Sequence, residues 1–371
     1  MGGFLIKKGD CSIEELSKVA FFQLIRISLG ETLKDFPKLA AAQWREVYRI
    51  AQEQALLGVL SVAIDQLPED RRPPREILFK WLVATEQIRQ RNIVLEKTVT
   101  KVASQFEADG YDSCILKGQG LAQLYPDPEL RTAGDIDIWI RGSRKEIVSL
   151  VRRLAGKTHV VYHHVDGLKM DGVAVEVHFT PSYMSNPFAN RRLQHWIDTE
   201  APKQFGHEVL LANGHRMHSP TLSFNRVFIL HHIYRHFFYE GIGLRQLQDF
   251  YYVIKQGFTE EERIETLQVY RQLNLLKFAG AVVYVLREVF GLAEQYFVVP
   301  PDEKYGKILL AEILVEGNFG QAFQTGQTSE TKSQRGLRII RRSLRFVKYA
   351  PEEVLWLPYF KLMNNICYVR Q

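Results

Sequence analysis

Three carboxylates stand inside two short apolar stretches of the chain. Asp135 and Asp137 alternate with isoleucines in "DIDIWI", and Glu176 lies in the middle of "VAVEVHF". Because residues i and i+2 of a strand face the same way, the two aspartates are predicted to share one face, about 6–7 Å apart along the chain. A lone carboxylate in an apolar strand is costly unless it is paired or neutralised. Gathered at one end of a sheet, the three acids would bind a divalent cation with hard oxygen ligands, Mg²⁺ (or Mn²⁺).

A glycine-rich turn, "LKGQGLAQLY", precedes the aspartates. Gly118 and Gly120 let backbone amides approach a ligand closely and open a short helix, where phosphate binds readily. Gln119 lies between them, and Lys117 and Arg131 are candidate partners for the charge of a triphosphate. With phosphates completing their shells, two metal ions about 3.5–4 Å apart could clamp the attacking and leaving oxygens of an in-line displacement. These residues therefore indicate metal-assisted phosphoryl chemistry.

The order of these motifs resembles that of a known superfamily. A glycine turn, a D-I-D-I strand and a third acid in V-E-V are similar to the polymerase-beta type of nucleotidyltransferase. More specifically, "ILKGQGLAQLYPDPELRTAGDIDIWI" resembles the bacterial branch of uncharacterised nucleotidyltransferases, which often occurs beside polysaccharide-synthesis genes. The resemblance covers most of the chain and includes "QALLGVL", "RNIVLEKTVTKVASQF", "HHIYRHFFYEGIGLRQLQDFYYVI", "GNFG" and "RFVKYAPEEV".

This resemblance implies roles for the candidate residues. Asp135 and Asp137 would ligate the metals, Glu176 would bind metal or accept the proton of the attacking hydroxyl, and Gly118 would belong to the nucleotide-binding turn. The implied reaction moves a nucleoside monophosphate from a triphosphate such as ATP to a hydroxyl-type acceptor on a small molecule, a glycan precursor or a protein. Pyrophosphate would be released. The alternative is an inactive nucleotide-binding, sensing or scaffold protein.

The sequence departs from the superfamily pattern in two places. Gln119 stands where the superfamily usually has a small residue after the first glycine, and fifteen residues separate Gln119 from Asp135. Both differences bear on how phosphate is contacted. The identity of the nucleotide therefore stays open.

Two further residues could support the site. His178 follows the third acid by two positions, so it shares that face and could orient the site, bind phosphate or make a structural hydrogen bond. Arg245 and Asp249 are one helical turn apart. An internal ion pair is the simpler expectation for them, and the alternative is that Arg245 reaches over the sheet toward the nucleotide or acceptor.

Other histidines and aromatic residues carry weaker signals. His232 and His236 are spaced i, i+4, but the H-E-x-x-H pattern of zinc sites is absent, so helix packing or lining of the site is favoured over zinc. Trp139 and Tyr183 could stack on a base, although packing in the core or at its rim is favoured.

The elements around these motifs predict three regions. Residues 1–109 read as helices, with Ser12 in a capping box and a long helical pattern over 75–108. Residues 110–200 combine short strands with helices, and 201–371 are again mainly helical. The expected fold class is α+β or α/β, with a small mixed sheet of nucleotidyltransferase type between two helical regions.

Composition predicts an ordinary globular protein, with 46% apolar and 24% charged residues. The sequence has neither an apolar run of roughly 18–20 residues nor the order of a secretory signal, so a cytoplasmic location is expected. Cys11, Cys114 and Cys367 lie far apart, which argues against a disulfide framework or a zinc site, and Cys114 is expected to be buried.

Positive charge is concentrated near the C-terminus. Seven of the basic residues lie in "KSQRGLRIIRRSLRFVK", and without them the net charge of +6 falls to about −1. Nucleic acid is therefore an unlikely partner, because a long strand would need a basic groove. Residues 337–348 are expected to form an amphipathic docking helix with a solvated basic face, and contact with an anionic lipid surface or a lipid-linked glycan acceptor is the sharper hypothesis. Its apolar stripe contains Leu337, Ile340, Leu344 and Val347.

Overall fold

The computed structural model describes residues 13–32, 35–318 and 331–369. Ser12 of the predicted capping box, Cys11 and the side chain of Cys367 lie outside this description. The N-terminal region is helical as predicted and contains α1 (Ile13–Ser28), α2 (Ala41–Glu53), α3 (Leu57–Gln66) and α4 (Arg75–Ala108).

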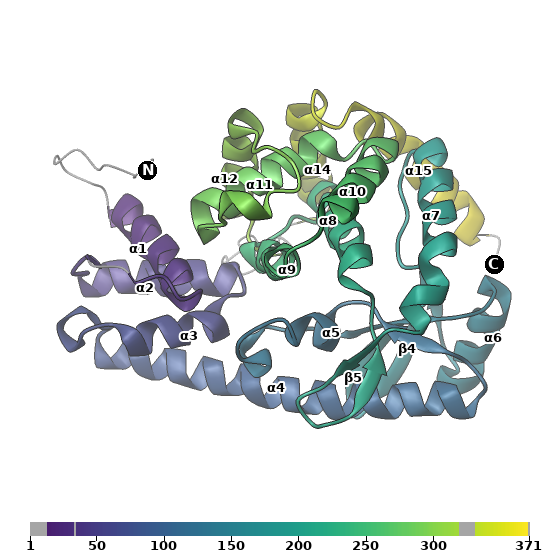
Figure 1. Cartoon of the computed structure of the whole chain (residues 1–371), viewed down its shortest axis with the longest axis horizontal. Coiled ribbons are helices and arrows are strands. Elements are labelled where there is room, and N and C mark those ends of the chain that lie inside the picture. The colour runs from purple at the N-terminus through teal and green to yellow at the C-terminus, as the bar shows by residue number, and fades with distance from the viewer. Residues whose placement is uncertain (1–12, 33–34, 319–330, 370–371) are drawn as a thin grey trace.

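The long helix α4 runs along the bottom of the molecule in Figure 1, beneath the sheet. It follows Pro73 and Pro74, and it ends before Gly110, whose φ of +82° is unfavourable for other residues. Its second half is part of the hydrophobic core under the sheet, through Leu95, Val99, Val102 and Phe106. The predicted division at residue 109 stays a prediction, and core contacts extend across it.

A five-stranded mixed sheet forms the centre, which confirms the predicted fold class. Its strands are β1 (Ser113–Ile115), β2 (Ile136–Ile140), β3 (His159–Val160), β4 (His164–Met170) and β5 (Val173–His178). The spatial order is β1-β2-β5-β4-β3, and β2 pairs with β5 in parallel whereas the other pairs are antiparallel. Short helices α5 (Gly118–Ala122) and α6 (Arg144–Ala155) flank β2, and β6 (Glu208–Leu210) pairs with β7 (Arg216–His218) in a separate ribbon.

The two faces of the central strands differ in chemistry. The isoleucines of β2 and the valines of β5 point into the core formed with α4 and α6, as predicted for Ile136 and Ile138. Asp137, Glu176 and His178 alternate with them and therefore lie on the opposite face. Because strand pairing and core packing fix this alternation, the polar face is aimed at the C-terminal helices.

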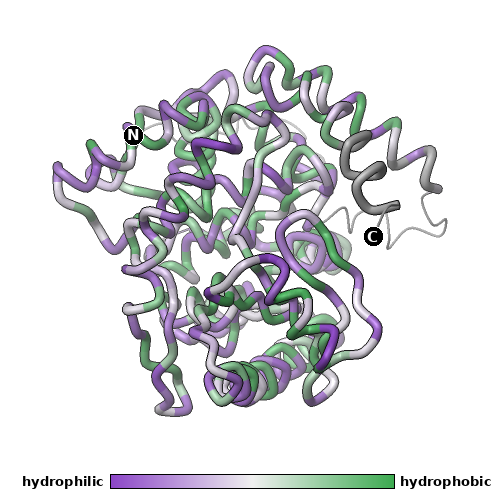
Figure 2. The backbone as a smooth tube through the Cα atoms, turned by 90° about the vertical axis from the view of Figure 1, so that its right-hand side faces the viewer, coloured by the Kyte–Doolittle hydropathy of each residue, from purple (hydrophilic) through white to green (hydrophobic). Residues whose placement is uncertain are grey.

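The C-terminal helices lie above the sheet in Figure 1, on the side of its polar face. They are α7 (Pro187–Phe205), α8 (Leu222–Tyr239), α9 (Leu244–Lys255), α10 (Glu260–Gln272), α11 (Leu276–Phe290), α12 (Glu303–Glu316), α14 (Lys332–Phe346) and α15 (Pro351–Val369). Hydrophilic and hydrophobic residues alternate along the traced helices in Figure 2. Among the described residues, no helix has the length and apolar character needed to cross a membrane.

Helix α14 has the reverse of the predicted orientation. Its apolar stripe is exposed to solvent at Leu337, Ile340 and Leu344. Some of its arginines instead contact α12: Arg342 is buried in contact with Glu316, and Arg345 Nη1 lies 2.6 Å from Glu312 Oε2, whereas Arg341 stays exposed. Because buried carboxylates require a cationic partner, the two glutamates of α12 draw the arginines inward. The prediction of a docked apolar stripe with a solvated basic face is therefore wrong.

Candidate functional site

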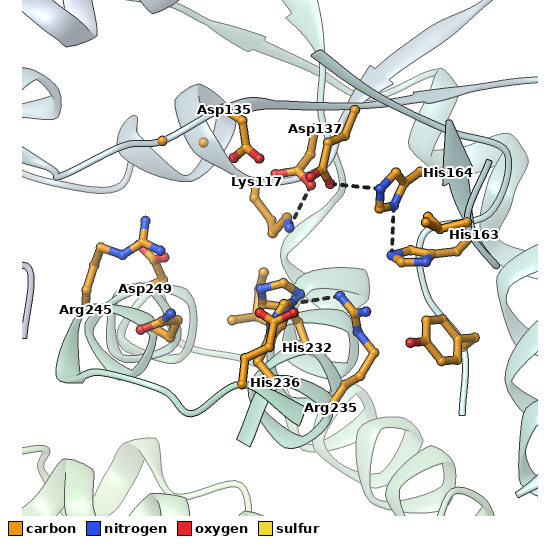
Figure 3. Close-up of a pocket in the computed structure, with 18 of the residues that line it drawn as sticks. Lys117, Asp135, Asp137, His163, His164, His232, Arg235, His236, Arg245 and Asp249 are labelled. Carbon is orange, nitrogen blue, oxygen red and sulfur yellow. Dashed lines mark hydrogen bonds and ion pairs between the residues drawn. The ribbon is translucent and has the colours of Figure 1, made fainter. Parts of the chain in front are cut away.

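A cavity of about 510 Å³ lies between the polar face of the sheet and helices α8 and α9. Figure 3 shows Lys117, Asp135, Asp137, His163 and His164 on the sheet side of it. The facing side carries His232, Arg235 and His236 from α8 and Arg245 and Asp249 from α9. Acidic, basic and imidazole side chains thus face one another across one cavity.

The sheet brings the three predicted acids to this cavity. In the parallel pairing of β2 with β5, Asp137 is opposite Glu176. Asp135 precedes the first residue of β2 by one position and shares the face of Asp137, and all three acids line the cavity. One ligand atom each from Asp137, Glu176 and His178 lie within 4.8 Å of one another, an arrangement that could hold a metal ion.

Two cationic groups contact Asp137. Lys117 Nζ lies 2.8 Å and His178 Nε2 3.1 Å from Asp137 Oδ1. Burial favours the neutral acid, but the charge of Lys117 and the hydrogen bond from His178 outweigh it and hold the pKa of Asp137 well below its ordinary value. Burial also opposes the charged form of His178, and its bonds to Asp137 and Glu176 nevertheless raise its pKa. His178, predicted to support the site, therefore contacts the acids directly.

Asp135 has the opposite electrostatic setting. Burial, followed by the charges of Asp137 and Glu176, raises its pKa from 3.8 to about 7. Asp135 therefore retains its proton to about neutral pH unless a cation replaces that proton. A hard divalent cation fits this set of carboxylate oxygens.

Asp135→Asn is expected to stabilise the protein in EDTA at pH 8, raising the melting temperature by about 2 °C or more. Well below pH 3.8 the carboxyl is protonated in both native and unfolded chains, and at pH 4 its ionisation in the unfolded chain has only begun to cost stability, so the substitution has little effect there. As pH rises from 3.8 to about 7 the native chain retains a proton that the unfolded chain has lost, so the wild type loses stability across this window. Thermal melts of both proteins at pH 4 and pH 8 measure the difference, and equal melting temperatures at pH 8 would contradict it.

The glycine turn meets the cavity only at its start. Gly118 lines the cavity and has a φ of +50°, a left-handed conformation that explains the glycine. The Gln119 side chain is instead buried, with Nε2 3.5 Å from Asn92 Oδ1. At Gly120 a side chain would collide with Ser219 Oγ. Gln119 and Gly120 were both predicted to bind nucleotide, but they face the protein interior. At these positions α5 packs against α4 and against the connection between β7 and α8.

Arg131 also differs from its prediction. Its Nε and Nη2 donate to the two carboxylate oxygens of Asp249 at 2.7 and 2.8 Å, and the Tyr125 hydroxyl donates to the same carboxylate at 2.7 Å. Arg131 and Asp249 are buried, although both border the cavity. Arg245, expected to pair with Asp249, directs Nη1 to the Thr132 carbonyl at 2.9 Å. The guanidinium predicted to neutralise a triphosphate is therefore held by a bidentate ion pair inside the protein.

Sequence analysis did not identify several residues that line the cavity. His164 Nε2 lies 2.9 Å from Asp166 Oδ1 and 3.7 Å from Glu176 Oε2. Arg235 stacks on the Tyr183 ring at 5.1 Å from its centroid, and its Nη2 is 2.8 Å from His236 Nε2. For His164 there was no reliable signal in the sequence, because a regular hairpin of "HHVDGLKM" with "VAVEVH" would put it on the core face, and the register shift between Val165 and Leu168 moves it to the acid-bearing face. Arg235 gave no signal either, since its place depends on how α8 crosses the sheet.

The other histidine and aromatic residues considered in the sequence lie either in the cavity wall or in the core. His232 and His236 both line the cavity, in agreement with the lining alternative, and burial lowers the pKa of each. Tyr183 lines the cavity as well. Trp139 is buried against Phe205 and Phe224, so packing explains it. Cys114 is buried as expected.

A protein-family model described as "Uncharacterised nucleotidyltransferase" matches residues 40–291, more than half of the chain. The chain belongs to this family. The matched range includes the glycine turn, all three acids and the parts of α8 and α9 that line the cavity, whereas α12, α14 and α15 lie beyond it. The expected nucleotidyltransferase family and a general nucleotidyltransferase role are thereby confirmed.

Comparison with solved structures gives a nucleotidyltransferase-like antigenic protein from Paracoccidioides brasiliensis. The match has 14% sequence identity, covers 52% of this chain and 92% of the other, and has a TM-score of 0.28. At that score the structural likeness carries no argument. Comparison with curated proteins finds no match.

Proposed function

We propose that this nucleotidyltransferase is metal-dependent and transfers a nucleoside monophosphate from a nucleoside triphosphate to a hydroxyl-type acceptor, with release of pyrophosphate. The observation that carries the proposal is the register of β2 and β5, which sets Asp137 beside Glu176 and Asp135 next to both on one wall of a cavity. Family membership supports the reaction class, and the carboxylate oxygens support the metal.

Asp135, Asp137 and Glu176 would hold Mg²⁺ or Mn²⁺, which when bound supplies charge neutralisation and polarisation of the phosphate oxygens. Lys117 then contributes a cation beside Asp137, and His178 holds the carboxylate in place through its 3.1 Å contact. Asp135, whose pKa is raised by burial and by the charges of Asp137 and Glu176, would give up its proton when a divalent ion binds.

The cavity has room for two substrates at its two ends. Asp135 and Arg245 are at one end in Figure 3, and His163 and Arg235 at the other. We assign the nucleotide to the first end, since Gly118 also lines the cavity and can offer its backbone to phosphate. The acceptor, whether a small molecule, a glycan precursor or a protein, would then lie near Arg235 and Tyr183.

Further features of the function are hypotheses of the same proposal. They are the use of ATP, a bacterial cytoplasmic setting and a role in polysaccharide synthesis. The exposed stripe of α14, with Arg341 and Lys348 also at the surface, keeps contact with an anionic lipid surface or lipid-linked glycan as a hypothesis for 337–348. This contact would rest on the apolar stripe rather than on a basic face alone.

A nucleotide-binding protein without turnover is the second candidate. The contacts of Lys117 and His178 with one oxygen of Asp137 favour it, because two cationic groups already neutralise the central carboxylate. Such a chain could bind nucleotide and signal its presence through α8 and α9 without transferring it.

Calorimetry and pyrophosphate release separate these candidates. The wild type is titrated with each non-hydrolysable triphosphate with and without Mg²⁺, and pyrophosphate is then followed with hydrolysable triphosphates and panels of hydroxyl acceptors. Magnesium-dependent binding together with acceptor-dependent pyrophosphate release supports the transferase. Binding without pyrophosphate release supports the second candidate, and the absence of nucleotide binding overturns both.

A further inference from the structure

A second group of possible metal ligands lies beside the three acids and includes one of them. His164 Nε2 is 2.9 Å from Asp166 Oδ1 and 3.7 Å from Glu176 Oε2, and ligand atoms of all three residues lie within 4.8 Å of one another. Asp135 and Asp137 are not members of this group. Figure 3 shows His164 on the sheet side of the cavity, joined by dashed lines to a neighbouring carboxylate and to His163.

A bulge in β4 creates this group. Val165 pairs with Val177 and Leu168 with Val175, so two residues, Asp166 and Gly167, oppose the single residue Glu176. Two carboxylates are thereby brought opposite each other across neighbouring strands, an arrangement that is unfavourable unless a proton-bearing imidazole or a cation lies beside both, and His164 Nε2 contacts both. Gly167 has a φ of +120°, and a side chain there would meet the Lys157 carbonyl, which explains the glycine in the bulge.

The ligand set resembles that of a transition metal more than that of magnesium. One imidazole nitrogen and two carboxylates give three protein ligands, the number found in catalytic zinc sites, which keep a fourth position for water or substrate. Tetrahedral bonds of about 2.0–2.1 Å place ligand atoms about 3.3 Å apart, between the two separations measured here. Magnesium prefers oxygen ligands in octahedral geometry, so the imidazole disfavours it.

His164 is also oriented as metal-bound histidines are. Its other ring nitrogen, Nδ1, lies 3.2 Å from Nε2 of the buried His163. A hydrogen bond at the second nitrogen fixes the ring and directs the free nitrogen at the ion, which is the usual arrangement around metal-ligating histidines. His164 and Glu176 both line the cavity, so an ion held here borders it.

We propose that His164, Asp166 and Glu176 bind a second divalent cation of the zinc or cobalt class, distinct from the magnesium site of Asp135, Asp137 and Glu176. Glu176 bridges the two sites, and the open coordination position of the second ion takes an oxygen of the acceptor. Binding of this ion does not require that the protein transfers nucleotides, whereas its role toward the acceptor rests on the proposed function.

Cobalt alone is the probe. The EDTA-stripped, full-length protein is titrated with Co²⁺ in the absence of nucleotide, by calorimetry and by visible absorption, where four-coordinate cobalt gives intense bands. We expect one Co²⁺ per chain with these bands, and competition by Zn²⁺ but not by millimolar Mg²⁺. His164→Ala is expected to weaken Co²⁺ binding at least about 100-fold and to abolish the bands. His164→Gln, which retains a polar side chain of similar reach, serves if the alanine variant does not fold.

Two controls make the test specific. His232→Ala removes another buried cavity histidine and should leave the cobalt bands unchanged. Asp135→Asn should lose magnesium-dependent nucleotide binding and still bind Co²⁺, so failure of the proposed function is distinguishable from failure of the second site. Unchanged Co²⁺ affinity in His164→Ala, equal losses in His164→Ala and His232→Ala, or absence of the bands in the wild type would each overturn the proposal.

Discussion

Asp137→Asn is expected to lower magnesium-dependent nucleotide turnover by about 10³-fold or more. Asp137 is the central acid of the proposed magnesium site, next to Glu176 in register and in contact with Lys117 and His178. Asparagine has nearly the same shape but no charge, so the magnesium ion loses a ligand anion while Lys117 and His178 lose their counter-ion. A factor of 10³ corresponds to about 4 kcal/mol, within the several kcal/mol that a catalytic metal contributes. Pyrophosphate release at saturating Mg²⁺ measures the loss.

A surface aspartate provides the matched control for this experiment. Asp198 is exposed on α7, so Asp198→Asn makes the same chemical change away from the cavity and should retain full turnover. Circular dichroism well below the melting temperature checks that the Asp137 variant is folded, since Lys117 loses its ion-pair partner and His178 keeps only Glu176. Turnover above one tenth of the wild-type rate in folded Asp137→Asn would show that Asp137 is not a metal ligand of the reaction.

The parts of the site that depend on local periodicity could be predicted from sequence. Alternation in "DIDIWI" places Asp135 and Asp137 on one face whatever the rest of the fold, and the apolar neighbours of Glu176 do the same for that strand. The helix over 75–108 is bounded by prolines and by a glycine, which act within a few residues. In each case, the physical cause lies inside the segment itself.

The structure departs from the predictions where a residue has a partner far along the chain. Arg131 was expected to face the triphosphate, but it pairs with Asp249, 118 residues later. In α14, the buried Arg342 contacts Glu316 of α12, so this arginine faces the interior and the apolar stripe faces solvent. The helical pattern of α14 alone cannot reveal a glutamate on another helix. The inward side of Gly120 likewise depends on Ser219. The charge of an arginine or the small size of a glycine indicates that the residue has a particular role. It does not indicate which part of the protein the residue contacts.

His164 belongs with the residues that depend on distant partners. Both its face and its nearness to Glu176 require the antiparallel pairing of β4 with β5 and the bulge that brings Asp166 opposite that acid. Hairpin register can be anticipated from sequence, whereas the position of a bulge is set by how both strands pack. The position of His164 beside the acids therefore became visible only in the assembled sheet, whereas His178 was identified from the sequence.

Arg131→Met is expected to destabilise the protein by about 3–5 kcal/mol, the effect of leaving one partner of a buried ion pair uncompensated. Asp249 would retain the Tyr125 hydroxyl but lose both hydrogen bonds and the charge of Arg131. Burial opposes the ionised form of Asp249, and the charge of Arg131 is the main influence that keeps its pKa low. Urea unfolding of wild type and variant at pH 7 measures the loss.

The double variant Arg131→Met/Asp249→Leu distinguishes an ion pair from simple loss of packing. Replacing both partners removes the uncompensated charge, so the double variant should recover much of the stability lost in either single variant, because buried pairs are often replaceable by apolar residues. If Arg131→Met instead unfolds like the wild type and binds triphosphate at least tenfold more weakly, Arg131 serves the nucleotide, as its sequence position first indicated. Both side chains border the cavity, and Asp249 belongs to α9. The nucleotide affinity of the same variants therefore also tests whether this ion pair positions α9 beside the proposed nucleotide site.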